Sequence, residues 1–196
     1  MGGAINVQEA DALMVASKAP NDMTLWTMME TPLGILHSEE IAFSSNRMGG
    51  FVLGTSDLAK NLHCRHTRDR LPMNTALGLC ILAARAAGIA ILDGAHVDLS
   101  DSEGFEYSCR QGLEMGFDGK TLIHPKTIET ANSIFSPSED ELVWSKRIIA
   151  AHGQAKKDGQ GVIVIEGKVI EELDVQNAER LVALANAISA TEGKTG

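Results

Sequence analysis

The sequence has few cysteines and no long hydrophobic run. Its 196 residues include only Cys64, Cys80 and Cys109, and no two of them form a C-x-x-C pair. An odd number without paired spacing is typical of reduced thiols, so we expect a cytoplasmic protein. No stretch approaches the roughly 18 apolar residues of a membrane span. The first residues also lack the basic and then apolar layout of a signal peptide.

Positive charge is also scarce. Lysine and arginine number 17 against 26 aspartates and glutamates, which gives a formal net charge of −9. An acidic surface attracts neither nucleic acid nor an anionic membrane, so we expect neither as a general partner. A local basic pocket for an anionic ligand remains compatible with this charge. The 44% of hydrophobic residues is ordinary for a globular protein, and the length suffices for a real core.

Strand-like and helix-like segments alternate along the first two thirds of the chain. Short, continuous apolar runs of the kind buried on both faces of a parallel sheet predict strands at 25–30, 49–54, 89–94 and 119–125. Helical spacing of apolar residues predicts helices at 7–19, 34–45, 75–88 and 101–116. Alternating units of this kind predict an α/β fold with parallel strands.

The last third follows a different pattern. It predicts a capped helix over 136–157, a hairpin over 159–173 with its turn at Glu166-Gly167, and an amphipathic helix over 174–190. A helix, hairpin and helix after the last βα unit resemble an appended arm or lid. We therefore place the α/β part at 1–135 and the arm at 136–196.

Acidic residues end the first two predicted strands. Glu30 follows the run "LWTMM", and Asp57 follows "GGFVLG". Ligands of parallel α/β sheets gather at the carboxyl ends of the strands, so these two carboxylates are expected to converge there. Mg²⁺ commonly takes one or two carboxylates, with substrate and water as its other ligands. The pair therefore predicts a metal site, although Glu30 capping a helix or pairing with a lysine is an open alternative.

Other polar residues follow the later strands. Asp93 ends the third predicted strand and His124 the fourth, while Arg65, Arg68 and Arg70 lie on a loop after the second. Cations at this position are suited to an anionic substrate. The ordinary alternatives are a turn at Asp93, a histidine bonded to backbone, and a solvated basic surface.

Four motifs, in order, give the sequence a family resemblance. "METPLG", "LGTSDLAK", "ILDGAHVDLSDSEGF" and "GFDGKTLIHPKTI" resemble the citrate lyase β-subunit and malyl-CoA lyase group of HpcH/HpaI-related CoA-ester lyases. The resemblance covers about Leu25 to Ile188 and includes the tail. It implies a (β/α)₈ barrel in which Glu30 and Asp57 hold Mg²⁺, with Mn²⁺ as an alternative.

The resemblance also implies an activity. Members of the family cleave or form the C–C bond of a 3-hydroxyacyl thioester, such as malyl-CoA, citramalyl-CoA or a citryl thioester, to give acetyl-CoA and a 2-oxo acid. Coenzyme A is then part of the substrate, and Arg65, Arg68, Arg70, Asp93 and His124 are candidates for contacting the CoA ester. A malyl-CoA thioesterase with the same metal site is the main alternative. An inactive half-barrel that binds only metal, CoA or a partner chain is another.

Two departures from the family pattern affect this interpretation. A full barrel takes about 250 residues, so the chain is expected to correspond to strands five to eight plus the arm. No arginine precedes Arg47 to match the family arginine that holds the substrate carboxylate, so we expect little turnover from this chain alone. We also expect it to form a homo-oligomer or to pair with a complementary N-terminal half. Glu171, in "GKVIE", replaces the aspartate of the family's "GKMID" and is the predicted acid/base residue, acting on a neighbouring subunit.

Overall fold

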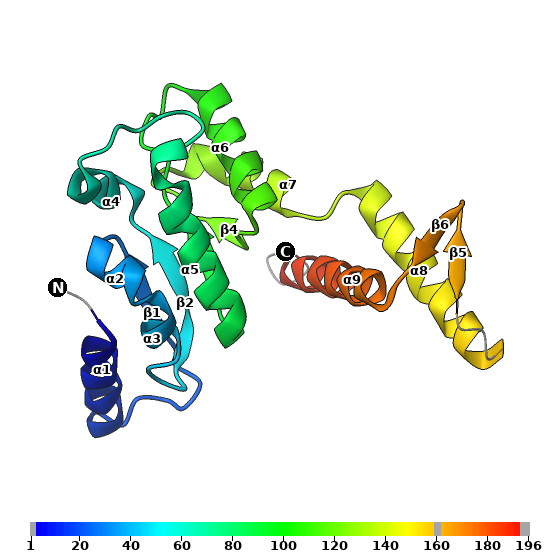
Figure 1. The fold of residues 1–196 in the computed structure, drawn as a ribbon, viewed down its shortest axis with the longest axis horizontal. Helices are drawn as coiled ribbons and strands as arrows, with labels where there is room; N and C mark the ends of the chain where they lie inside the picture. Colours follow the sequence, from blue (N-terminus) through cyan, green and yellow to red (C-terminus); the bar gives the residue numbers. More distant parts are fainter. Residues whose placement is uncertain (1–2, 159–161, 193–196) are drawn as a thin grey trace. The chain divides into compact units, whose positions relative to one another are not determined.

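The chain forms two compact units, residues 1–135 and 136–196 (Figure 1). Each unit buries hydrophobic residues of its own. The computed structural model describes residues 3–158 and 162–192. The elements of the first unit are α1 (Ala4–Ala16), β1 (Leu25–Met29), α2 (Pro32–Leu36), α3 (Ser38–Ala42), β2 (Met48–Leu53), α4 (Thr55–Leu62), η1 (Leu71–Met73), α5 (Asn74–Ala87), β3 (Ala90–Asp93), α6 (Ser102–Met115), β4 (Gly119–Lys120), η2 (Pro125–Thr127) and α7 (Ile128–Phe135).

A four-stranded parallel sheet organises the first unit. Its strands are hydrogen-bonded in the order β1-β2-β3-β4, which is also their order in the sequence. Strands added in sequential order form the wall of a barrel, whereas a doubly wound sheet reverses its order at a switch point. The predicted α/β fold with a parallel sheet is therefore confirmed.

The fourth strand is much shorter than expected. β4 contains only two residues, so the predicted strand over 119–125 was wrong beyond Lys120. Thr121 turns out of the strand and donates both its N–H and its hydroxyl to the carbonyl oxygen of Asp93. His124 then caps the 3₁₀ turn that begins at Pro125, because its ring accepts a bond from the N–H of Lys126.

The core lies between the sheet and the helices that follow its strands. Phe51, Leu77 and Ile91 are fully buried there, and Leu53 is nearly so. On β1, by contrast, Trp26 and Met28 are 46% and 55% exposed. The Trp26 ring lies against β2, where a side chain on Gly50 would come within 2.4 Å of it. The absence of a side chain at Gly50 therefore leaves room for this ring against the neighbouring strand.

Several helix ends follow from the sequence, and others do not. α5 and α6 end at glycines in the left-handed conformation, Gly88 with φ 68° and Gly116 with φ 102°, as expected for helix caps. The single helix expected over 34–45 was wrong, because α2 and α3 are separate helices that meet at His37. The helices α4 and α7 were not predicted.

The second unit contains two long helices and a hairpin. Its elements are α8 (Glu139–Asp158), β5 (Ile163–Ile165), β6 (Lys168–Ile170) and α9 (Glu172–Glu192). The strands are antiparallel, and Glu166 and Gly167 turn between them with φ 52° and 79°, as expected from the sequence. Residues 159–161 of the predicted hairpin lie outside the described residues. Ile148, Ile170, Val175 and Ala178 form the core of the unit.

All three cysteines are free thiols, in agreement with the sequence interpretation. Burial raises the pKa of the Cys80 thiol to about 12 and is the main cause that raises that of Cys109 to about 11. Both are therefore protonated near neutral pH and are poor nucleophiles. Within the described parts of the chain, no helix combines the length and apolar character needed to cross a bilayer.

Candidate metal site

Glu30 and Asp57 lie at the same edge of the sheet. Glu30 directly follows β1, and Asp57 is in the first turn of α4, the helix that follows β2. β1 and β2 are parallel neighbours, with Met29 paired to Leu53 as the last residues of the two strands. The chain therefore places both carboxylates just beyond the carboxyl ends of adjacent strands, as the sequence predicts.

Gly54 has no side chain and so leaves the space that the Glu30 side chain occupies. It lies between β2 and α4, and a β-carbon added to it would come within 2.4 Å of Glu30 Oε2 and 2.6 Å of Glu30 Cβ. The backbone at Gly54 has φ −92°, so the glycine is needed for space and not for a left-handed conformation. The N–H of Gly54 donates to the carbonyl oxygen of Met29, and the Asn61 side chain donates to that of Glu30. These bonds fix the Glu30 backbone against α4.

The donor set fits a hard divalent cation. In the region that the structure describes, no group of three or more His, Cys, Asp or Glu side chains could hold a metal ion by itself. Two carboxylates that leave positions for substrate and water are the arrangement that Mg²⁺ commonly accepts, whereas structural zinc sites require four protein ligands. The Glu30 carboxylate lies against Gly54, the residue that precedes the helix carrying Asp57.

Asp93 belongs to a buried ion cluster. Its side chain is fully buried, and its carboxylate accepts bonds from Arg70 Nη1 at 2.6 Å, Lys120 Nζ at 2.7 Å and the N–H of Gly94 at 2.8 Å. Both oxygens are therefore used inside the protein. This corrects the expectation that Asp93 contacts a substrate directly, because its carboxylate instead holds two cations in place.

Arg70 is also more constrained than the sequence suggested. Its side chain is only 9% exposed, and its Nε donates to the side-chain oxygen of Gln111 at 2.7 Å. Its backbone is left-handed, with φ 54°, which is uncommon for a residue with a side chain. Arg70 is therefore a buried, paired guanidinium, unlike the exposed Arg65 and Arg68, and its contact with a CoA ester stays a prediction.

Lys120 lies in the predicted strand 119–125 but was not among the site residues expected from the sequence. Its side chain is 1% exposed, and burial lowers its pKa while the Asp93 carboxylate opposes that change. In the structure, β3 and β4 pair in parallel with Asp93 opposite Lys120. The residue was missed because its ion pair with Asp93 depends on this register, which the sequence alone does not fix.

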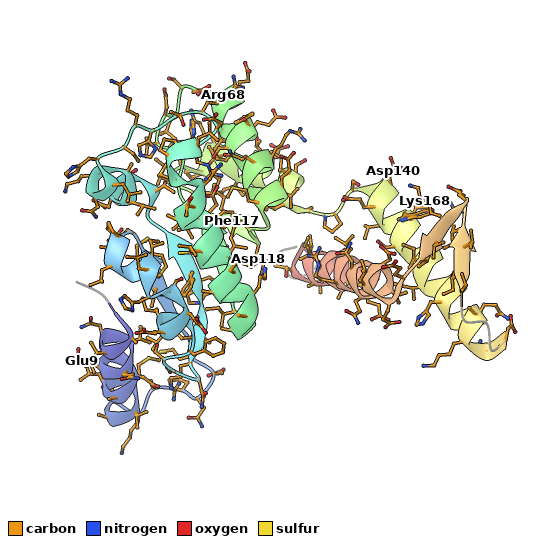
Figure 2. All side chains as sticks on the ribbon, in the orientation of Figure 1. Glu9, Arg68, Phe117, Asp118, Asp140 and Lys168 are labelled. Carbon is orange, nitrogen blue, oxygen red and sulfur yellow. The ribbon has the colours of Figure 1, made fainter. Side chains whose placement is uncertain are left out.

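The remaining candidates are exposed. Arg65 lies on the loop after α4, and Arg68, labelled in Figure 2, bonds to Glu103 at 2.9 Å and stacks over Tyr107 at 4.6 Å. His124 is exposed near the end of β4. Glu171 lies in the second unit, exposed before α9, and its backbone N–H donates to the Asp174 carboxylate. Within the first unit, Asp93 and Arg70 belong to one buried cluster, whereas Arg65, Arg68 and His124 are exposed.

Comparison with known proteins identifies relatives over most of the chain. A (3S)-malyl-CoA thioesterase of Cereibacter sphaeroides is 50% identical over 181 residues, covering 92% of this chain and 63% of the relative. An L-malyl-CoA/beta-methylmalyl-CoA lyase of the same organism is 33% identical over 211 residues, covering 97% and 66%. The chain thus spans less than two thirds of the length of either relative.

A solved structure and a family model agree with these relatives. The structure of CitE from Mycobacterium tuberculosis, in complex with magnesium, acetoacetate and coenzyme A, matches 95% of this chain and 66% of its own length, with a TM-score of 0.73 and 27% identity. The family model described as HpcH/HpaI aldolase/citrate lyase matches residues 6–125. That segment is more than half of the chain and contains β1 to β4, Glu30 and Asp57. The chain therefore belongs to the HpcH/HpaI aldolase/citrate lyase family.

Proposed function

We propose that this chain supplies the metal-binding part of a magnesium-dependent enzyme that acts on the CoA ester of a 3-hydroxy acid. The observation that carries the proposal is the position of Glu30, seated against Gly54 at the start of the helix that bears Asp57. The similar structure of CitE supports the proposal, because it is a complex with magnesium, acetoacetate and coenzyme A.

Glu30 and Asp57 are the residues that would hold the cation. When bound, Mg²⁺ would supply positive charge to the carboxylate and hydroxyl oxygens of the acid half of the substrate. Two ligands from adjacent strands would orient that half at the carboxyl edge of the sheet. The exposed side chains of Arg65 and Arg68 could then contact CoA phosphates. The side chain of His124 is also exposed and could contact the CoA ester.

Two reactions are compatible with this site. Cleavage of the C–C bond, the reaction expected from the sequence, requires the acetyl-CoA fragment to take up a proton. Hydrolysis instead requires water to attack the thioester carbonyl carbon and release free CoA. The identity of 50% with the thioesterase, against 33% with the lyase, favours hydrolysis as the reaction of the protein that contains this chain.

Product analysis distinguishes the two reactions. With (3S)-malyl-CoA and Mg²⁺, an active assembly that contains this chain should release free CoA and malate if it is a thioesterase, or acetyl-CoA and glyoxylate if it is a lyase. Chromatography of the acyl-CoA pool, with and without EDTA, measures both outcomes. Turnover that continues at full rate in EDTA, or formation of neither pair of products, would contradict the proposed function.

Glu171 is proposed to be an acid/base residue of the C–C cleavage reaction. It is exposed at the end of the β5–β6 hairpin, so it could reach another surface without losing a buried partner. Replacing it by glutamine keeps its size and removes its proton transfer, so a lyase should lose about 10²-fold or more in turnover. Glu172→Gln is the matched control, since Glu172 is an exposed neighbour. Equal activity of the two variants would leave Glu171 without a chemical role.

Strand β1 forms an edge of the sheet that a partner could cover. Within the described residues, β1 pairs with β2 alone, and a cavity of about 350 Å³ runs beside it between α1 and the strand. Unpaired strand edges favour association. We propose that this edge meets a second copy or a complementary N-terminal half, and a well-folded monomer in sedimentation velocity at micromolar concentration would contradict it.

A further inference from the structure

The buried ion cluster of Asp93, Arg70 and Lys120 fixes the backbone that follows β3. The Asp93 carboxylate, which accepts bonds from the two cations, also accepts the N–H of the next residue, Gly94, at 2.8 Å. The backbone carbonyl oxygen of Asp93 accepts two bonds from Thr121. Both polar groups of the peptide that joins Asp93 to Gly94 are therefore bonded to protein groups, which holds Gly94 in place.

Gly94 lies against Thr55, the first residue of α4. A β-carbon added to Gly94 would overlap Oγ1 of Thr55 and would come within 2.7 Å of its Cγ2. It would also come within 2.8 Å of the carbonyl oxygen of Leu53, the last residue of β2. Thr55 is only 6% exposed, although threonine is a residue type found mostly at the surface. The Thr55 side chain therefore packs into the space that the absent side chain of Gly94 leaves.

This packing acts at the start of the helix that carries Asp57. Gly54, the residue before α4, provides no side-chain cap, although such caps commonly bond the first N–H groups of a helix. Leu58 and Ala59 hold α4 in the core, but they follow the first turn. Asp57 is exposed in that first turn. The direction of its carboxylate therefore depends on how the chain enters the helix.

We propose that Thr55 is a positioning residue for the metal ligand Asp57. The buried ion cluster acts on the metal site through it, because the cluster holds Gly94 and Gly94 supports Thr55. This role rests on the proposed function, since it takes Asp57 as a ligand of Mg²⁺. Thr55 lies two residues before Asp57 in the same turn, so a shift of its backbone moves the Asp57 carboxylate relative to Glu30. Mg²⁺ demands near-ideal octahedral geometry, so displacement of one ligand lowers its affinity.

Gly94→Ala tests this role without changing a carboxylate. The backbone of Gly94 lies outside the left-handed region, so alanine can adopt it, and the added methyl group should displace Thr55. The affinity of the whole chain for Mn²⁺, measured by electron paramagnetic resonance, should fall about tenfold or more, as is typical when a residue that supports a metal ligand is lost. Gly78→Ala is the matched control, because a β-carbon at Gly78 on α5 would meet nothing within 4 Å.

A second variant separates this role from a general loss of stability. Thr55→Ala removes the group that packs against Gly94 and should also weaken Mn²⁺ binding. It makes room for the added methyl group as well, so the double variant Gly94→Ala/Thr55→Ala should bind Mn²⁺ more tightly than Gly94→Ala alone. If Gly94→Ala does not fold, Thr55→Ala carries the prediction by itself, with Thr75→Ala, at an exposed threonine of α5, as its control.

Hydrogen exchange provides a measurement that needs no metal. In EDTA, residues 55–62 should exchange faster in Gly94→Ala than in wild-type protein or Gly78→Ala, because the first turn of α4 has lost its support. Absence of Mn²⁺ binding by wild-type protein would overturn the proposed function and this role together. Equal Mn²⁺ binding by wild-type and folded Gly94→Ala protein, unchanged exchange over 55–62, or additive losses in the double variant would overturn this role alone.

Discussion

Replacing Glu30 by glutamine should greatly weaken Mg²⁺ binding. Loss of a residue that hydrogen-bonds to a metal ligand typically lowers metal affinity about 10- to 100-fold, and we expect loss of a ligand itself to lower it more. Glutamine keeps the size of the side chain but lacks the negative charge that a hard cation requires. Asp57→Asn should have the same effect, and the double variant should bind no metal. Titration with Mg²⁺, or with Mn²⁺ observed by its electron paramagnetic resonance, measures the change. Glu129→Gln, at an exposed acid on α7, is the control and should bind metal as the wild type does.

Gly54→Ala gives an independent test of the same site without touching a carboxylate. Its backbone conformation is open to alanine, so the substitution adds only a methyl group. That group would overlap the positions of both the β-carbon and the carboxylate of Glu30, which must then move. We expect metal affinity to fall about 10- to 100-fold. Unchanged affinity in a folded Gly54→Ala protein would show that the observed position of Glu30 is not the one that binds metal.

The largest loss of stability is expected from Asp93→Asn. The substitution removes the single buried negative charge that Arg70 and Lys120 share and leaves two desolvated cations facing each other. Removing one partner of a buried ion pair typically costs about 3–5 kcal/mol. The midpoint of urea unfolding, followed by circular dichroism, should fall accordingly.

Glu103→Gln is the matched control for this measurement. It breaks the ion pair with Arg68, in which both side chains are mostly exposed, and exposed pairs contribute about 0–1 kcal/mol. Asp93→Asn should therefore be far more damaging than Glu103→Gln. Equal unfolding midpoints for the two variants would mean that the buried cluster is not a stabilising unit, and the role assigned to Asp93 would be wrong.

The parts of the fold that the sequence predicts are those set by local pattern. Short apolar runs locate β1, β2 and β3, although Trp26 and Met28 leave one face of β1 largely exposed. Gly88, Gly116 and Gly167 mark turns with positive φ, which glycine adopts easily. The family resemblance is confirmed by the match over residues 6–125. The positions of Glu30 and Asp57 follow from the general rule that parallel strands present their carboxyl ends on one side.

The parts that the sequence does not predict depend on contacts distant in the chain. The pairing of Asp93 with Lys120 requires the register of β3 and β4, and the burial of Arg70 requires Gln111 from α6. α2 and α3 divide at His37 in a segment whose apolar spacing alone predicts one helix. In each case packing decides the outcome, because local pattern leaves more than one arrangement open.

A crystal structure of the protein grown with Mg²⁺ tests the central claim most directly. We predict one cation at the carboxyl edge of β1 and β2, with a Glu30 oxygen and an Asp57 oxygen each about 2.0–2.1 Å from it, and with water or substrate at the other positions. A cation bound elsewhere, or the two carboxylates directed to opposite faces of the sheet in the presence of saturating Mg²⁺, would contradict the account.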